Sequence, residues 1–110
     1  MNVFILGTNE AIENVNAAEI DLKDAGYMPV NPIKFINSIH GITEDQMVEV
    51  GYALLDMCEA VYFAIGTWSN YPVLNQYVGY ARAKGMAFYE PETLPYASYS
   101  EIQKGTEITE

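Results

Sequence analysis

The sequence contains few basic residues and no basic cluster. Five lysines and arginines stand against fifteen aspartates and glutamates among 110 residues, and the formal net charge is −10. Because proteins bind a phosphate backbone mainly through clustered Lys and Arg, this composition argues against nucleic-acid binding. The acidity is typical of a solubilising surface. The alternative interpretation is an acidic surface that blocks a basic partner protein.

Cysteine, histidine and long hydrophobic runs are also scarce. Cys58 is the only cysteine, which excludes an internal disulfide and fits a reducing compartment. The apolar run at residues 3–6 is too short to span a bilayer and lacks the flanks of a signal peptide, so we expect a cytosolic protein without membrane association. His40 is the only histidine, and no cluster of cysteines or carboxylates accompanies it at metal-ligand spacing. We therefore expect neither a metal site nor a cofactor.

What the sequence does contain is a regular alternation of strand and helix patterns. We predict strands at residues 1–6, 27–32, 60–65 and 86–89, and helices at residues 11–25, 43–57 and 72–84. Asn9 is the expected N-cap of the first helix, and Thr43 with Gln46 forms a capping box for the second. This order predicts a single α/β domain over residues 1–92, Rossmann-like and three-layer αβα, with a mainly parallel sheet of four or five strands. Residues 93–110 are expected to form a C-terminal strap or a flexible tail.

Four segments resemble one known family in their order and spacing. They are the loop Leu6-Gly7-Thr8-Asn9, the passage from Gly26-Tyr27 to Val30-Asn31-Pro32, the strand that leads into Gly66 and Trp68, and the helix that runs from Tyr77 and Ala81 to Gly85. Together they resemble the nucleoside 2-deoxyribosyltransferase-like superfamily, in particular its short, largely uncharacterised bacterial and phage members. The resemblance implies a protein of the bacterial cytosol, encoded by a bacterium or by a phage.

The family's chemistry, as the resemblance implies it, requires a carboxylate that attacks the anomeric carbon of a deoxynucleoside. Tyr77 stands where the family carries its nucleophilic glutamate, and residues 66–88 contain no Asp or Glu. Gly51 falls nearest to the family's supporting aspartate. A phenol with a pKa of about 10 is a poor nucleophile at neutral pH without a neighbouring base or cation. The sequence therefore argues against the family's standard reaction.

Three loops follow the strands at the edge where parallel sheets bind ligands. The candidate ligand-binding residues on these loops and on the helix that follows are Gly7, Thr8, Asn9, Asn31, Gly66, Trp68, Ser69, Asn70, Tyr71 and Tyr77. A glycine turn before a helix can accept an anion, and Trp68 offers a stacking surface for a base. The competing interpretations are a plain capped turn, and a tryptophan that covers the edge of the sheet.

These observations predict a pseudoenzyme that binds a nucleotide-like small molecule without glycosyl transfer. For a phage protein, one version is an anti-defence role, the sequestration of a nucleotide immune signal. The alternative is an N-glycosidase or deoxyribosyltransferase, acting on deoxynucleosides or their monophosphates, with a relocated acid such as Glu10, Glu49 or Asp56. The helices at residues 43–57 and 72–84 carry more apolar surface than one sheet face needs, which predicts a homodimer or a higher homo-oligomer.

Overall fold

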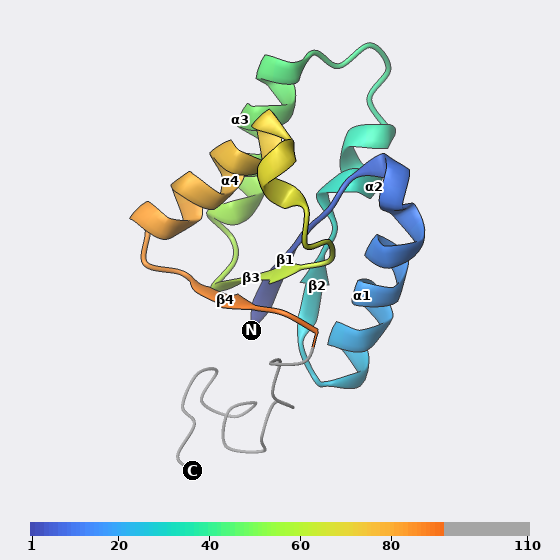
Figure 1. Ribbon diagram of the computed structural model, residues 1–110, viewed down its shortest axis with the longest axis vertical. Coiled ribbons are helices and arrows are strands. Elements are labelled where there is room, and N and C mark those ends of the chain that lie inside the picture. The colour runs from blue at the N-terminus through green and yellow to red at the C-terminus, as the bar shows by residue number, and fades with distance from the viewer. Residues whose placement is uncertain (92–110) are drawn as a thin grey trace.

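Four parallel strands form one sheet in the computed structural model, which describes residues 1–91 (Figure 1). The strands are β1 (Asn2–Leu6), β2 (Met28–Val30), β3 (Ala60–Phe63) and β4 (Ala87–Tyr89). Their order across the sheet is β2-β1-β3-β4, so β1 and β3 are central. β1 pairs with β2 from Asn2–Met28 to Phe4–Val30, and with β3 from Val3–Ala60 to Leu6–Phe63. Both central strands are short apolar runs, as expected of strands covered on two faces.

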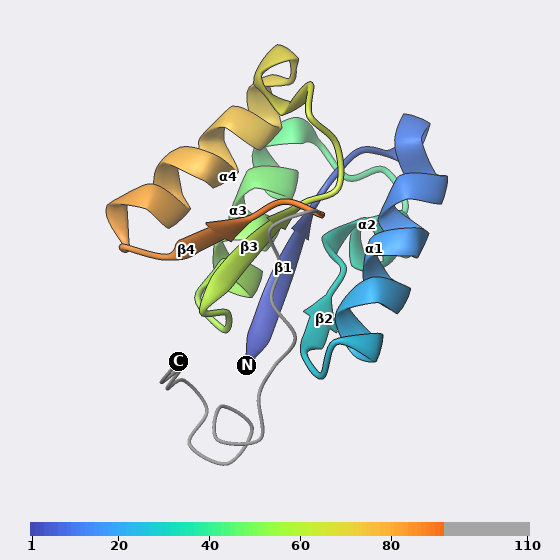
Figure 2. The same cartoon turned by 60° about the horizontal axis from the view of Figure 1, so that its bottom comes forward.

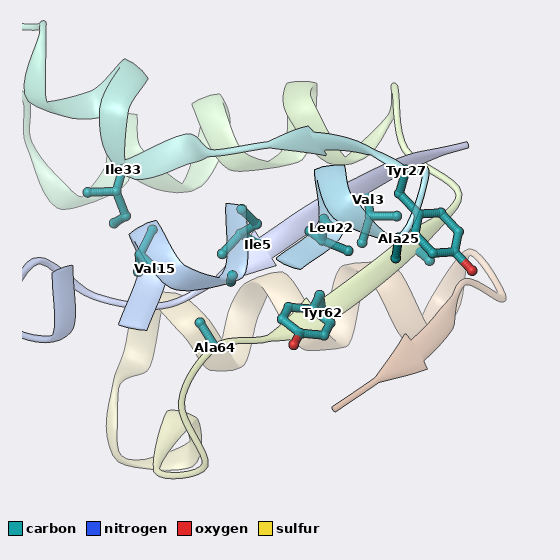
Figure 3. Close-up of a cluster of buried hydrophobic side chains, with 11 residues drawn as sticks. Val3, Ile5, Val15, Leu22, Ala25, Tyr27, Ile33, Tyr62 and Ala64 are labelled. Carbon is teal, nitrogen blue, oxygen red and sulfur yellow. The ribbon is translucent and has the colours of Figure 1, made fainter. Parts of the chain in front are cut away.

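Helices cover both faces of this sheet (Figure 2). α1 (Ile12–Asp24) lies on one face, whereas α3 (Glu44–Leu55) and α4 (Pro72–Ala83) lie together on the other. Alternate residues of β1 serve the two cores: Val3 and Ile5 pack under α1 (Figure 3), and Phe4 and Leu6 pack under α3 and α4. The predicted three-layer α/β architecture with a parallel sheet is therefore confirmed. None of the helices in residues 1–91 is long and apolar enough to cross a membrane.

Local sequence signals account for most of the helix boundaries. The capping box of α3 is present, because Thr43 Oγ1 accepts from the Gln46 N–H at 3.2 Å and Gln46 Oε1 accepts from the Thr43 N–H at 2.9 Å. Asn9 is not the N-cap of α1. It belongs to a 3₁₀ turn, η1 (Asn9–Ala11), that precedes the helix, and Ala11 stands at the cap position.

A short helix, α2 (Pro32–Asn37), follows β2 and helps to form the site described below. Asn31 caps it, since its Oδ1 accepts from the N–H groups of Ile33 at 3.1 Å and Lys34 at 3.4 Å. Pro32 occupies the first position, where its fixed φ suits a helix and its missing N–H costs nothing. A second 3₁₀ turn, η2 (Trp68–Asn70), precedes α4. The strap or tail predicted for residues 93–110 lies outside the described residues.

Candidate functional site

A cavity of about 190 Å³ opens at the carboxyl ends of β1 and β2. Apolar side chains of β1, α2, α3 and α4 form most of its wall. Its polar lining consists of Thr8, Asn9, Glu44, Tyr71 and Tyr77. In open parallel sheets, ligands bind at this edge, beside the point where the strand order reverses. Here the order reverses at β1, because β2 lies on one side of β1 and β3 lies on the other.

The structure brings half of the predicted site residues to this cavity. Gly7, Thr8, Asn9, Tyr71 and Tyr77 line it. Asn31 does not, because its side chain turns back to cap α2. The remaining four predicted residues, Gly66, Trp68, Ser69 and Asn70, belong to the loop between β3 and α4 and lie outside this lining.

Trp68 packs against the sheet instead of facing the cavity. Its ring stacks on Phe63 with centroids 5.6 Å apart and an interplanar angle of 20°, and Phe63 stacks in turn on Phe88 of β4. A second hollow, of about 270 Å³, lies beside Trp68 and Gly66 and reaches Pro91, the last described residue. The tryptophan is thus part of an aromatic stack over β3 and β4, as in the interpretation that it covers the edge of the sheet.

Tyr77 closes the inner side of the cavity and is held in place by contacts on several sides. Its side chain is 3% exposed, and its ring meets Phe4 edge-on with centroids 5.4 Å apart. Its hydroxyl donates to the backbone carbonyl of Met47 at 2.6 Å. Burial raises the pKa of Tyr77 to about 12, because the buried phenolate would lose its hydration. The phenol is therefore protonated at neutral pH, and it donates its proton to a backbone carbonyl of α3.

Gly51 provides the space that the tyrosine ring occupies. A Cβ atom placed on Gly51 would overlap with Cε1 and Cζ of Tyr77. Positions 77 and 51 are the two at which this chain differs from the catalytic pair that the resemblance implies, and the residues at these positions are matched in size. The ring at position 77 fills the volume into which any side chain at position 51 would project.

The acids proposed as relocated nucleophiles lie at different distances from the cavity. Asp56 follows the C-terminus of α3, a 12-residue helix of about 18 Å whose other end lines the cavity. It accepts from Lys84 Nζ and from the Tyr80 hydroxyl, both at 2.7 Å, and these bonds hold the pKa of Asp56 below its usual value. Glu49 is exposed and does not line the cavity. Glu10 lies at the rim, where its Oε1 accepts from the Tyr71 hydroxyl at 3.3 Å.

Glu44 is the acid that lines the cavity, and it is not among the site residues predicted from the sequence. The signal was available in the capping box. That motif makes Glu44 the first residue of α3, and a helix between parallel strands begins at the carboxyl edge of the sheet.

Two hydrogen-bonded links and two unpaired atoms complete the surroundings. The side-chain amides of Asn9 and Asn37 bond reciprocally at 3.0 and 2.9 Å, which ties η1 to the end of α2. Thr8 Oγ1 and Asn31 Nδ2 are buried and have no hydrogen-bond partner among residues 1–91. Buried polar atoms are usually paired, so these two atoms are exceptions within this part of the chain. No three His, Cys, Asp or Glu side chains of residues 1–91 are grouped so as to hold a metal ion.

Comparison with known proteins identifies a solved structure with a similar fold. No protein-family model and no curated protein sequence matches the chain. Among solved structures, the chain is similar to the CMP N-glycosidase BcmB of Clostridium botulinum, with a TM-score of 0.57 and 13% sequence identity, over 99% of this chain and 86% of that one. The chain shares the fold of a nucleotide N-glycosidase. At this identity the likeness shows a shared fold alone, which agrees with the fold expected from the resemblance to the nucleoside 2-deoxyribosyltransferase-like superfamily.

Proposed function

We propose that this protein binds a nucleoside- or nucleotide-derived small molecule in the cavity between β1, α2, α3 and α4, and does not cleave its glycosidic bond. The observation that carries the proposal is the pairing of Tyr77 with Gly51. In a fold shared with an N-glycosidase, a protonated phenol stands where the resemblance implies a nucleophilic carboxylate, and its ring fills the space of the supporting acid. The cavity remains although the implied chemistry has been lost.

The size and lining of the cavity favour part of such a ligand. Pockets that bury drug-sized molecules have volumes of about 300–1,000 Å³, and this cavity, at about 190 Å³, suits a base or a sugar better than a complete nucleotide. The apolar wall from α2 and α4 would cover a planar ring. Thr8, Asn9 and Tyr71 would supply the polar contacts. A ligand would therefore bury one half and leave the other at the rim.

Binding can be tested by blocking the cavity with a larger side chain. Val73 lines the cavity, whereas Val48 is equally half-buried but lies outside the lining, so Val73→Phe and Val48→Phe form a matched pair. The full chain is first screened by thermal shift against nucleosides, nucleotides and free bases. A ligand at a hundred times its Kd stabilises the folded state by about 2.7 kcal/mol. We expect Val73→Phe to abolish the shift and Val48→Phe to retain it. Absence of any stabilising compound in the screen would contradict the proposal.

An N-glycosidase with a relocated acid is the second candidate, and the position of Glu44 is what favours it. This acid lines the cavity, and Glu10 lies at its rim. The test is incubation with deoxynucleosides and their monophosphates, followed by chromatography for the free base. We expect no release. Release that is lost in Glu44→Gln but retained in Glu49→Gln, an exposed acid on the same helix, would instead establish an enzyme.

Self-association is proposed through the paired surface of α3 and α4. Tyr52 and Tyr80 stack there with centroids 4.1 Å apart, and both remain partly exposed. Partly exposed aromatic residues of this kind are enriched in protein interfaces. Light scattering at micromolar concentration tests the proposal, and a strict monomer would exclude it.

A further inference from the structure

The cavity has no cationic side chain in its lining. The Lys and Arg residues among residues 1–91 are Lys23, Lys34, Arg82 and Lys84, and none of them lines it. Three of them have other contacts: Lys34 pairs with Glu19 at 3.0 Å, Lys84 pairs with Asp56, and Arg82 lies over the Phe88 ring. A phosphate group at the cavity would therefore meet no guanidinium or ammonium group of this part of the chain.

Acidic side chains lie at the cavity, where basic side chains would be needed to stabilise an anion. Glu44, an exposed residue, stands in the cavity lining, and Glu10 lies at the rim. The first turn of α4 has no side-chain cap, so its N–H groups offer the cavity about half of a positive charge. One full carboxylate charge in the lining outweighs that half charge, and the second carboxylate at the rim adds to the repulsion.

The polar groups that remain are suited to a neutral ligand with hydrogen-bond donors. The Glu44 carboxylate can only accept, and the Tyr71 hydroxyl already donates to Glu10 and can accept. Sugar hydroxyls and exocyclic amino groups of bases donate to such acceptors. A phosphate offers further acceptors and negative charge.

We infer that the cavity selects an uncharged nucleoside or free base and rejects the corresponding 5′-phosphate, with Glu44 as the main specificity-determining residue and Glu10 as the second. The inference rests on the proposed binding function and specifies its ligand. It distinguishes this chain from the structure it resembles, which is described as acting on CMP. It also opposes the narrower role of sequestering a nucleotide immune signal, since such a signal carries phosphate.

The experiment is a calorimetric titration of the full chain with four nucleosides, their free bases and their 5′-monophosphates, beginning with cytidine, cytosine and CMP. We expect at least one nucleoside to bind about tenfold more tightly than its monophosphate, a ratio that one or two carboxylates close to a phosphate can produce at intermediate dielectric. Raising the salt concentration should reduce the ratio. Glu44→Gln should reduce it several-fold by strengthening monophosphate binding, and Glu10→Gln should do so to a smaller extent. Glu49→Gln, an acid of the same helix that lies outside the cavity lining, should leave the ratio unchanged.

The outcomes separate this inference from the function on which it rests. If monophosphates bind as tightly as nucleosides, or if Glu44→Gln leaves the ratio unchanged, the charge selection is wrong while the binding function stands. If neither nucleosides nor bases nor monophosphates bind, the proposed function falls and the inference falls with it.

Discussion

The two halves of the carboxyl edge of the sheet are built in opposite ways. Beside β3 and β4, the rings of Trp68, Phe63 and Phe88 stack into one continuous layer. Beside β1 and β2, aliphatic side chains of α2 and α4 line the candidate cavity together with two rings, Tyr71 and Tyr77, the second of which is held by α3. The comparison indicates that the rings of the first half pack on one another, whereas the two rings of the second half lie in the wall of a cavity.

The largest effect is expected from closing the space behind the cavity. Gly51→Ala places a Cβ into the Tyr77 ring, and overpacking of this kind costs about 1–3 kcal/mol or more. Gly79→Ala, in α4, is the matched control, because a Cβ there meets nothing within 4 Å. Replacing that helical glycine should stabilise the protein by about 0.5–1 kcal/mol. Urea denaturation measures both variants, and equal effects at the two glycines would show that Gly51 and Tyr77 are not matched.

A double variant sharpens this prediction. Tyr77→Ala removes the ring against which the new methyl group would press, so Gly51→Ala should cost much less in that background than in the original chain. Additive free energies of unfolding would contradict the contact, because residues in direct contact are expected to couple.

The second effect should separate stability from binding at the two halves of the edge. Trp68→Ala removes one ring of the three-ring stack, and we expect the free energy of unfolding to fall by about 2 kcal/mol, less than the 3–5 kcal/mol typical of a fully buried aromatic residue. Ligand affinity should not change, because Trp68 is outside the cavity lining. Tyr71→Ala should do the reverse, weakening the ligand more than the fold. Loss of affinity in Trp68→Ala, measured by titration under conditions where the variant is folded, would move the site to the other half of the edge.

The sequence patterns predict the sheet and its helices, but not the difference between the two halves of the carboxyl edge. The alternation of apolar strands with capped helices is a local signal, and the box formed by Thr43 and Gln46 survives in the structure unchanged. The placement of Trp68 depends on a contact between β3 and β4, because it is their pairing that brings Phe63 and Phe88 together. No periodicity within the loop carries that information. The composition of the loop, polar and aromatic, suits a site and a packing layer equally well.

The candidate cavity was only partly predictable for a similar reason. The loop at residues 7–9 was placed correctly at the carboxyl end of β1, since that follows from the strand order. The α2 wall was missed because a helix of six residues is too short for a periodic pattern. Its side chains reach the cavity only through the turn that Asn31 caps. Glu44 was missed although the capping box already places it at the start of α3.

The smallest effect concerns the phenol at the base of the cavity and separates its two functions, filling and bonding. Tyr77→Phe keeps the ring and removes one hydrogen bond to the Met47 carbonyl, for a net cost of about 1 kcal/mol at neutral pH. The pKa of Tyr77 is raised to about 12 in the folded chain from an ordinary value of 10.0, so the unfolded chain loses this proton first. Stability from this group is therefore complete below pH 10 and is lost as the pH rises toward 12.

Cys58 behaves in the same direction, because burial raises its pKa from 9.0 to about 12. In alkaline denaturation, Cys58→Ala should flatten the decline that begins near pH 9, and Tyr77→Phe the part that begins near pH 10. A Tyr77→Phe variant that follows the original chain at every pH above 10 would mean that the phenol ionises freely. The hydrogen bond to Met47 would then contribute nothing that depends on the proton of Tyr77.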